Sequence, residues 1–502
     1  MEKASLRVKK NLLNRIMDDP FFLGIDIGTQ GARVVLLDVK GNIAGSSEEP
    51  FPLDEKMLEE QSPPAWWDAC SRSLTKLIGE VKSEIDLKNI QAISVTSTSG
   101  TVIPLDRLHN PLHDAIMYSD KRSAAAGMLC REMALRFHPE GYCGFNASSG
   151  LAKMVWFSQN FPGKISRMAK WIHATDFIIG KLSDRWGITD YSNALKSGFD
   201  LHRFGWPAYL SDQLPLQKEW LPQVVPSGTV IGTLSPRTAE KLGLSEKIKV
   251  VAGITDGCAS QFASGAVNPG EWNTTIGTTL VIKGVTRNEI KDPEDRLYNH
   301  RHPSGYWMPG GAGNTGADWV TKKFMDRLPE MEEIALQLMP TGFMAYPLQQ
   351  QGERFPFIAA GARGFSPEGL SDAEQFTANM EGVAYIERLA YELIENLSGE
   401  KVRAVFSAGG GSNSNAWLKI RCNVLNRPIR KMKHVTGAAG VAMLAASKTY
   451  FHSIEEAVTA LSQTEKELHP EKFLATAYER YYQHFKEILY SKGYIQKEIQ
   501  DA

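Results

Sequence analysis

Two Gly-Thr pairs lie at equivalent places in widely separated parts of the chain. The first, Gly28-Thr29, and the second, Gly277-Thr278, each close a segment rich in strand-forming residues. Small residues expose backbone N–H groups and threonine adds a hydroxyl, so such turns suit the oxygens of a phosphate group. A tight hairpin that only requires glycine is the alternative for either turn alone. The second copy favours phosphate binding.

Two aspartates are placed where strands end. Asp26 precedes the first turn inside an apolar segment, and Asp256 follows the apolar segment that ends at Ile254-Thr255. A carboxylate beside a phosphate turn suits Mg²⁺, and one positioned aspartate can accept a proton from an attacking hydroxyl and align its oxygen. We therefore predict Asp26 as the metal residue and Asp256 as the general base. Structural hydrogen bonding of Asp26 and helix capping by Asp256 are the alternatives.

A third glycine-rich segment, Ala408–Ser412, follows an expected strand and precedes an expected helix. It could pack against a flat adenine or hold a phosphate through backbone groups. The chain has no GxxxxGK[ST] segment and no HRD or DFG element, so the folds that carry those motifs are excluded.

The surrounding pattern predicts an α/β protein with a repeated hairpin. Residues 21–38 and 272–285 both read as strand, Gly-Thr turn and strand, with Ile-Gly-Thr shared between them, which suggests a duplicated domain. After the first glycines the chain enters the apolar run Val34–Leu37 rather than a helix, which excludes a dinucleotide-binding fold. Further helices are expected near 63–85, 376–397, 415–426 and 470–490, and further strands near 90–96, 248–254 and 402–408.

The length of 502 residues requires more than one domain. We expect an N-terminal extension over residues 1–20, a first domain over 21–246, and a second domain over 247–502 that ends in a charged helical tail. The segment 200–245 reads as an irregular connection that leaves the first domain.

Composition excludes several classes of partner. A net charge of −1 gives no field that gathers nucleic acid, and no apolar run is long enough to cross a membrane, so we expect a cytoplasmic protein that binds neither. The chain is expected to act as a monomer or homodimer. His300 and His302 are read as a surface loop and not as a metal site. The scattered cysteines are read as free thiols: Cys70, Cys130, Cys143, Cys258 and Cys422.

Taken together, these segments resemble the FGGY carbohydrate kinases, relatives of actin, hexokinase and the Hsp70 ATPase. The resemblance covers about residues 21–490 and rests on motifs in the order of that family: GIDIGTQGARVVLLD, EQSPPAWW, YSDKR, GITDGCAS, IGTT, GERFPF with ARG, and SAGGGSNSNAW.

The resemblance implies two ribonuclease-H-like domains with a central cleft. The first domain would bind mainly the sugar and the second mainly ATP, with Mg²⁺ as the metal. By motif position, Asp256 is the catalytic base and Asp26 serves Mg²⁺ and the phosphates. The residues expected to hold the nucleotide are Gly28, Thr29, Gln30, Arg33, Gly277, Thr278, Thr279, Gly410, Gly411, Ser414 and Trp417, and the last four would line the adenine site.

The resemblance also bears on the substrate. Bacterial xylulokinases typically have Met-His-Gly where this chain has Thr98-Ser99-Gly100, and the YSDKR segment looks more like the ribulokinase-like branch. D-Ribulose is therefore the first choice, with D-xylulose open and glycerol, a hexulose or an aldonate as further alternatives. The residues expected to bind the sugar are Ser99, Gly100, Asp120, Arg122 and Asp256.

One motif departs from the family pattern. An acidic residue usually precedes ARG, whereas this chain has Ile358-Ala359-Ala360-Gly361 there.

A nucleotide-dependent sensor or filament protein related to actin remains the alternative from a non-enzyme class.

Overall fold

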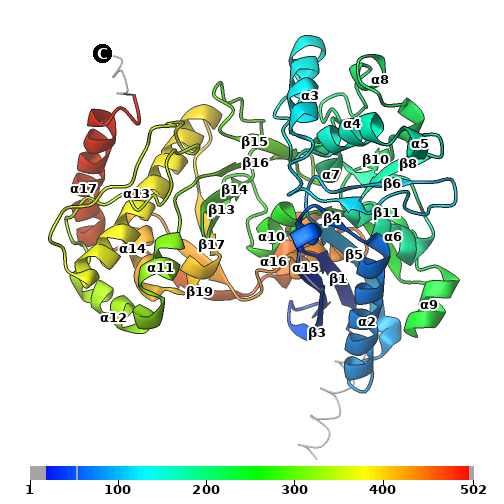
Figure 1. Ribbon diagram of the computed structural model, residues 1–502. Coiled ribbons are helices and arrows are strands. Elements are labelled where there is room, and N and C mark those ends of the chain that lie inside the picture. The colour runs from blue at the N-terminus through cyan, green and yellow to red at the C-terminus, as the bar shows by residue number, and fades with distance from the viewer. Residues whose placement is uncertain (1–18, 52–54, 497–502) are drawn as a thin grey trace, which may run out of the picture. The chain divides into compact units, whose positions relative to one another are not determined.

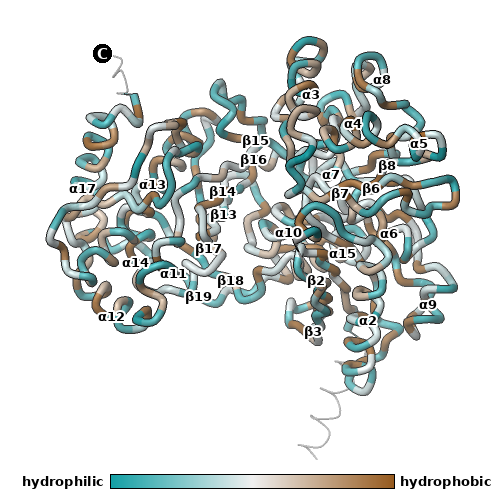
Figure 2. The backbone as a smooth tube through the Cα atoms, in the orientation of Figure 1, coloured by the Kyte–Doolittle hydropathy of each residue, from teal (hydrophilic) through white to brown (hydrophobic). Residues whose placement is uncertain are grey.

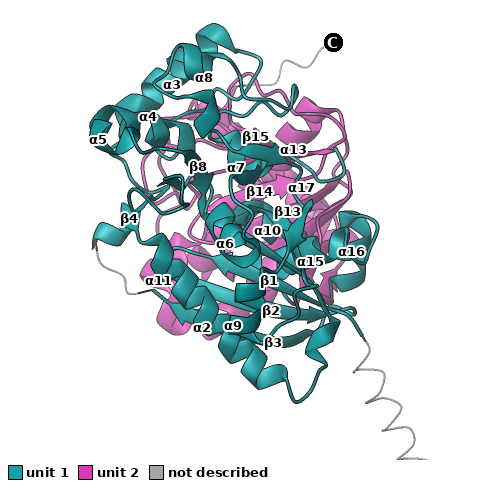
Figure 3. Ribbon diagram, turned by 90° about the vertical axis from the view of Figure 1, so that its right-hand side faces the viewer, with its two compact units in different colours: residues 1–263, 300–305, 434–462 teal, residues 264–299, 306–433, 463–502 magenta. Residues whose placement is uncertain are grey.

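The computed structural model describes residues 19–51 and 55–496 and contains two compact units (Figures 1 and 3). Unit 1 consists of the chain up to Ala263 together with residues 300–305 and 434–462. Unit 2 consists of residues 264–299, 306–433 and the chain from Gln463 onward. The expected extension over residues 1–20 falls almost entirely outside the described residues.

The main sheet of unit 1 has six strands. An antiparallel meander of three strands continues into parallel strands, because β1 pairs antiparallel with β2 and parallel with β5. The expected hairpin is therefore confirmed. In order across the sheet the strands are β11 (Val230–Thr233), β12 (Lys249–Thr255), β5 (Ile90–Ser97), β1 (Phe21–Ile27), β2 (Gly31–Asp38) and β3 (Ile43–Pro50).

Strand β1 separates two differently packed faces. Leu23 and Ile25 join a core with helices α2 (Pro63–Val81) and α6 (Ala174–Ser183) on one face. On the other face, a Cβ atom at Gly24 would lie 1.9 Å from the carbonyl oxygen of Ala438, so glycine is needed for α15 (Gly437–Ser447) to approach. Side chains alternate along a strand, so Asp26 belongs to the α15 face.

The remainder of unit 1 is built around a small antiparallel sheet with its own apolar core. In order, its strands are β4 (Glu60–Gln61), β7 (Ala115–Ile116), β6 (Val102–Leu105) and β8 (Lys170–His173). A separate two-stranded sheet consists of β9 (Ile188–Asp190) and β10 (Gln223–Val225). The helices are α3 (Ala124–Phe137), α4 (Gly150–Asn160), α5 (Pro162–Ile165), α7 (Tyr191–Leu195), α8 (Tyr209–Asp212), α9 (Pro236–Leu242), α10 (Asp256–Ala263) and α16 (Ile454–Leu461).

Unit 2 repeats the central arrangement of unit 1. Its strands β16, β14 and β13 form an antiparallel meander, and β13, β17 and β18 continue in parallel, as β3, β2, β1, β5 and β12 do. The repeat supports the duplicated domain expected from the shared Ile-Gly-Thr. In order the strands are β15 (Tyr298–Arg301), β16 (Trp307–Ala312), β14 (Leu280–Gly284), β13 (Glu271–Ile276), β17 (Ala404–Ala408), β18 (Ile429–Met432) and β19 (Thr464–Leu468).

Helices of unit 2 supply a core rich in buried tyrosine and tryptophan. They are α11 (Asp318–Lys323), α12 (Leu328–Leu338), α13 (Asp372–Ser398), α14 (Asn415–Leu425) and α17 (Lys472–Ser491). Figure 2 shows hydrophobic residues alternating with hydrophilic ones along the helices and strands, while many outer loops are hydrophilic. The expected helices at 376–397, 415–426 and 470–490 are thus confirmed within a few residues.

The unit boundary differs from the one expected near Glu246. Strand β12 pairs with β5 inside the first sheet, and unit 1 continues to Ala263. Helices α15 and α16, orange in Figure 1, return to unit 1, where α15 lies against the blue strand β1. The connection expected over 200–245 also contributes β11 to the main sheet. Sequence order alone does not reveal such returns.

Three expectations can be compared with the structure. The interpretation of His300 and His302 as a surface loop is wrong, because His300 lies in β15 and both side chains are buried. All five cysteines are free thiols, as expected. Within residues 19–51 and 55–496, no helix is both long and apolar enough to cross a membrane.

Candidate functional site

The structure brings Asp26 and Asp256 together in unit 1. Asp26 lies opposite Thr96 in the parallel pair β1–β5, and the Thr96 hydroxyl donates a 2.6 Å hydrogen bond to the carbonyl of Ile254 in β12. Burial and, next in size, the negative charge of Asp256 raise the pKa of Asp26 to about 6, although the positive charge of Arg33 opposes the shift. The raised pKa marks a carboxylate pair that an electropositive ligand would stabilise.

Helix α15 begins directly over Asp26. A Cβ atom at Gly437 would lie only 2.7 Å from the Asp26 carboxylate oxygen Oδ2, so glycine leaves the room that the carboxylate occupies. The Thr436 hydroxyl caps the helix by accepting from the backbone N–H of Ala439 at 3.2 Å. The positive end of the helix dipole thus faces an acidic group.

The first Gly-Thr turn is tight and partly open. The Gly28 N–H donates to the carbonyl of Gly31 at 3.0 Å, while Thr29 is half-buried and Gln30 is exposed. Arg33 lies opposite Asp26 on β2 and forms a 2.8 Å ion pair with Glu48 near the surface. The turn and Arg33 are therefore next to Asp26, as the sequence predicts for a phosphate site.

Asp256 combines the two roles considered for it. It is the first residue of α10, and its Oδ1 accepts a 2.7 Å hydrogen bond from the backbone N–H of Gly257. It is partly exposed, although the strand β12 that precedes it is almost wholly buried. A rigid, partly accessible carboxylate at a strand end suits a general base.

The loop after β5 carries the predicted sugar residues Ser99 and Gly100. Gly100 has φ of +87°, and a Cβ atom there would lie 2.2 Å from the carbonyl oxygen of Ser148, so the position requires glycine. The Ser99 hydroxyl is buried and makes no hydrogen bond with any part of the chain that the structure describes. Such a group can bond to a ligand hydroxyl without losing a protein contact.

Arg122 forms an ion pair with Asp120, and both residues were predicted to bind the sugar. Its guanidinium donates to both carboxylate oxygens, at 3.0 Å from Nε and 2.7 Å from Nη2, and it also pairs with Glu60 at 2.5 Å. The Asp120 side chain is 0% exposed and that of Arg122 is 36% exposed, over the ring of Trp156 at 4.7 Å. Arg122 is therefore the member of this pair that a ligand can reach, and Asp120 holds the Arg122 guanidinium in position.

Lys153 is a buried cation that the sequence prediction missed. Its ammonium donates to the carbonyl of Ala147 and, at 3.5 Å, to that of Asp120, and burial lowers its pKa to about 8. Lys153 lies in α4 between apolar residues, and a lone lysine in such a helical segment is the signal that could have identified it. It connects the Asp120 loop to the loop after Asn146.

The second Gly-Thr turn and the glycine run lie side by side in unit 2. Thr275 of β13 pairs with Ala408 of β17, so the chain leaves both strands at the same edge of the sheet. A Cβ atom at Gly277 or Gly410 would meet nothing within 4 Å. Open backbone at two adjacent turns is what a phosphate or a flat base requires. Gly411 lies beside Gly410 but is buried, and Thr278 is exposed with Thr279 half-buried.

Ser414 and Trp417 lie deeper than an adenine-lining role suggests. The Ser414 hydroxyl caps α14 by accepting from the N–H of Trp417 at 3.0 Å. The Trp417 indole is buried, donates to the carbonyl of Met380 at 3.0 Å, and supports Gly411 from below. Both residues therefore hold the glycine run in place, and Gly410 is the part of the run that faces outward.

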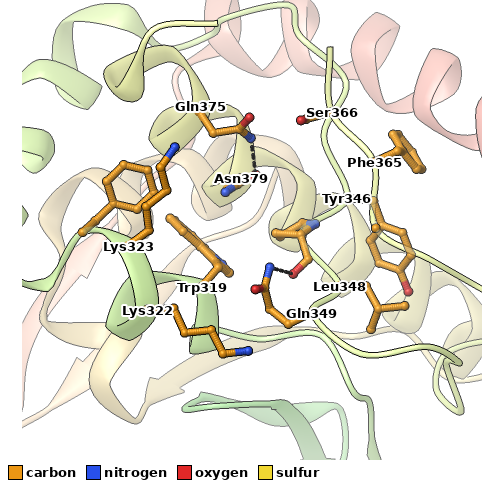
Figure 4. A pocket seen from close by; sticks show the side chains of 13 residues that line it. Trp319, Lys322, Lys323, Tyr346, Leu348, Gln349, Phe365, Ser366, Gln375 and Asn379 are labelled. Atoms are coloured by element: carbon orange, nitrogen blue, oxygen red, sulfur yellow. Dashed lines mark hydrogen bonds between the residues drawn. The ribbon is translucent and has the colours of Figure 1, made fainter. Parts of the chain in front are cut away.

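A hollow of about 450 Å³ in unit 2 lies apart from these turns (Figure 4). It is lined by α11, the start of α13 and the segments 346–349 and 364–366, and none of the predicted nucleotide residues borders it. Its lysines are already paired, Lys322 with Asp318 at 3.3 Å and Lys323 with Asp372 at 3.1 Å. The geometry of the glycine turns therefore remains the better guide to the nucleotide.

Two units with the same meander and parallel strands, each with a Gly-Thr turn after its first strand, have the fold of two-domain, actin-like ATPases. Residues 21–263 match the N-terminal domain of the FGGY family of carbohydrate kinases, and residues 272–449 match its C-terminal domain. The chain belongs to the FGGY family of carbohydrate kinases. It is therefore an ATP-dependent enzyme that phosphorylates a carbohydrate hydroxyl.

Similar proteins within the family differ in the substrates they are named for. A xylulose kinase of Bacillus subtilis is 26% identical over 498 residues, which cover 93% of this chain and 98% of that protein. A glycerol kinase of Thermococcus onnurineus is 27% identical over 485 residues, covering 90% and 94%. A solved xylulose kinase from Rhodospirillum rubrum superposes with a TM-score of 0.82 at 23% identity, covering 94% and 99%.

Proposed function

We propose that this enzyme transfers the γ-phosphoryl group of ATP to the primary hydroxyl of a keto-pentose, with D-ribulose the first candidate and the pentulose 5-phosphate and ADP as products. The observation that carries the proposal is the pair formed by Asp26 and Asp256, in which the charge of one carboxylate raises the pKa of the other. The Gly28 turn lies directly beside the pair.

In this mechanism Asp256 accepts the proton of the sugar hydroxyl as the oxygen attacks the γ-phosphorus. The new bond joins that oxygen to phosphorus, the bond from phosphorus to the β–γ bridging oxygen breaks, and ADP leaves with the electron pair. The Gly257 N–H holds Asp256 Oδ1 at 2.7 Å and limits its rotation. The backbone N–H groups of the glycine turns are suited to hold phosphate oxygens.

The acidic pair also fits a Mg²⁺ ion. Two facing carboxylates are stabilised by a divalent cation, and Mg²⁺ prefers one or two carboxylates, with water and phosphate oxygens as its other ligands. No group of three or more metal-ligating side chains occurs in the described ranges. Asp26 would hold the ion, which neutralises charge on the phosphates.

In unit 2 the nucleotide would rest on the open glycines Gly277 and Gly410, which have free space where a side chain would be. Thr278 and Thr279 add hydroxyls at the same turn, and Gly316 packs against them so closely that a Cβ atom there would lie 2.4 Å from the Thr278 carbonyl oxygen. A turn that is packed against Gly316 on one side and has free space at Gly277 on the other is suited to phosphate binding.

The sugar would contact the Ser99 hydroxyl and the exposed face of Arg122. The absence of the Met-His-Gly histidine at Thr98-Ser99-Gly100 favours D-ribulose. D-Xylulose is the second candidate, because relatives that cover nearly the whole chain are named xylulose kinases. The two ketoses are epimers, and hydrogen-bonding sites separate epimers less sharply than they reject a missing hydroxyl.

The deciding experiment is a competition between D-ribulose and D-xylulose scored by kcat/KM, with glycerol and gluconate assayed alongside. The proposal expects a pentulose to be phosphorylated with the highest kcat/KM, and D-ribulose before D-xylulose. Preference for D-xylulose would select the second candidate, and preference for glycerol or gluconate would refute the pentulose assignment.

A further inference from the structure

A buried carboxylate that the proposed chemistry does not use is linked through one side chain to the residue before Asp256. Asp190, at the end of β9, is 1% exposed. Its Oδ1 accepts from the Ser192 hydroxyl at 2.5 Å, from the Ser192 N–H at 2.8 Å and from the Ser227 hydroxyl at 2.9 Å, and its Oδ2 accepts from the Asn193 amide at 2.5 Å. The carboxylate is therefore fixed by three side chains.

Ser192 joins the fixed carboxylate of Asp190 to Thr255, the residue before Asp256, through hydrogen bonds. Its only hydroxyl hydrogen is donated to Asp190, so the oxygen is free to accept, and it does so from the backbone N–H of Thr255 at 3.0 Å. A hydroxyl that donates to a carboxylate is a stronger acceptor, and its orientation is set. The end of β12 is thus fastened to α7.

The same strand end is held on its other side. The Thr96 hydroxyl donates to the carbonyl of Ile254 at 2.6 Å. Ile254 and Thr255 are adjacent, so two side chains from different elements fix the last peptide units before Asp256. The backbone from which Asp256 projects consequently has little freedom to move.

We propose that Ser192, oriented by Asp190, is a positioning residue for Asp256: it fixes the backbone of Thr255 so that the carboxylate of Asp256 meets the sugar hydroxyl. The inference rests on the proposed role of Asp256 as the base. A displacement of about 1 Å in a reacting group costs on the order of 100-fold in rate, so the bond matters for catalysis as well as for folding.

Ser227 provides a matched control. It is as fully buried as Ser192 and donates to the same oxygen of Asp190. Its hydroxyl is bonded to Asp190, whereas the Thr255 N–H bonds to Ser192. Ser192→Ala and Ser227→Ala both remove one donor from the buried carboxylate, but only the first releases Thr255.

The experiment compares wild type, Ser192→Ala, Ser192→Thr and Ser227→Ala by steady-state kinetics, thermal melting and hydrogen–deuterium exchange of a peptide that contains Thr255. The inference expects Ser192→Ala to lower kcat roughly 10- to 100-fold, with the KM for the sugar little changed and exchange at the Thr255 peptide faster. Ser227→Ala should melt at a similarly lowered temperature but keep kcat within about threefold, and Ser192→Thr should restore most of the activity.

Equal losses of kcat in the two alanine variants, or unchanged exchange in Ser192→Ala, would overturn the inference. Wild-type protein that forms no ADP with any sugar would instead refute the proposed function. The exchange data then still decide whether Ser192 holds the strand end, so the two failures are distinguishable.

Discussion

Asp26 lies in an environment that disfavours the charged form of its carboxylate. It lies in a buried strand, faces the negative charge of Asp256 and has a pKa near 6. Arg33 opposes this shift only partly, because Arg33 is engaged with Glu48 at 2.8 Å. A carboxylate kept in such a place is destabilising unless a ligand compensates, which is typical of functional sites.

This environment predicts a pH-dependent stability. The folded pKa of Asp26 lies above the unfolded value, so the folded state binds an extra proton between about pH 4 and pH 6 and loses stability as pH rises through that window. Asp26→Asn removes the titration. We expect the variant to match wild type near pH 4 and to exceed it on the order of 1–2 kcal/mol above pH 6, in urea unfolding without nucleotide.

The two unfolding series should be run in the same buffers, since only their difference isolates Asp26. If the free energies of unfolding of wild type and Asp26→Asn differ by a constant amount from pH 4 to pH 8, folding does not raise the pKa of Asp26.

At the scale of elements, α15 is decisive because its first turn shapes the acidic pair. Gly24 of β1 lets the helix approach, and Gly437 leaves room for the carboxylate of Asp26. The helix consists mainly of small residues, and every one of them is buried. Close packing of this kind transmits small changes of volume to the neighbouring groups.

Gly437→Ala therefore should impair catalysis. The added Cβ atom meets Asp26 Oδ2 at 2.7 Å, so the carboxylate must shift, and we expect kcat to fall roughly 10-fold or more. Gly79→Ala in α2 is the control, because a Cβ atom there meets nothing within 4 Å. The control should keep full activity and gain about 0.5–1 kcal/mol of stability. Equal activity in both variants would contradict this role for Gly437.

Several elements of the fold could be predicted from the sequence. Both hairpins, the Gly-Thr turns and the helices α2, α13, α14 and α17 were predictable, because hydrophobic period and glycine placement are local signals. The meeting of Asp26 with Asp256 followed from both lying at strand ends. The burial of Trp417 was not predictable, since a tryptophan after a glycine run fits an adenine site or a core equally well.

Long-range packing explains the other misses. Lys153 and Ser192 acquire their contacts only when segments distant in sequence meet. The boundary expected near Glu246 was wrong because a composition shift marks a loop, whereas β12 pairs with β5 through the sheet. Nothing in the local sequence of α15, which consists mainly of small residues, indicates which sheet it will cover.

At the scale of the whole molecule, unit 1 is discontinuous in sequence. It takes α15 and α16 from residues 434–462, after the chain has passed through most of unit 2. The face of β1 that carries Phe22 packs against Tyr450 and Phe451, with ring centroids 5.9 and 6.4 Å away. The first unit is therefore incomplete until the last part of the chain has been made.

A truncated chain tests this dependence. A fragment that ends at Ala263 lacks α15 and exposes the apolar face of β1, so we expect no cooperative thermal melt and strong binding of a hydrophobic dye. Joining residues 434–462 to that fragment through a flexible Gly/Ser linker should restore part of the cooperativity. A sharp, cooperative melt of the short fragment would show that α15 is dispensable for folding.

The role of Asp256 as the base that makes this ATPase fold a sugar kinase can be decided by measuring ADP release across a panel of sugars with wild type and Asp256→Asn. We expect ADP release by wild type to depend on a keto-pentose, and we expect kcat to be lower by about 10²–10⁴-fold in the variant at an unchanged melting temperature. Wild-type ADP release that is independent of sugar, or an Asp256→Asn variant that phosphorylates as well as wild type, would contradict it.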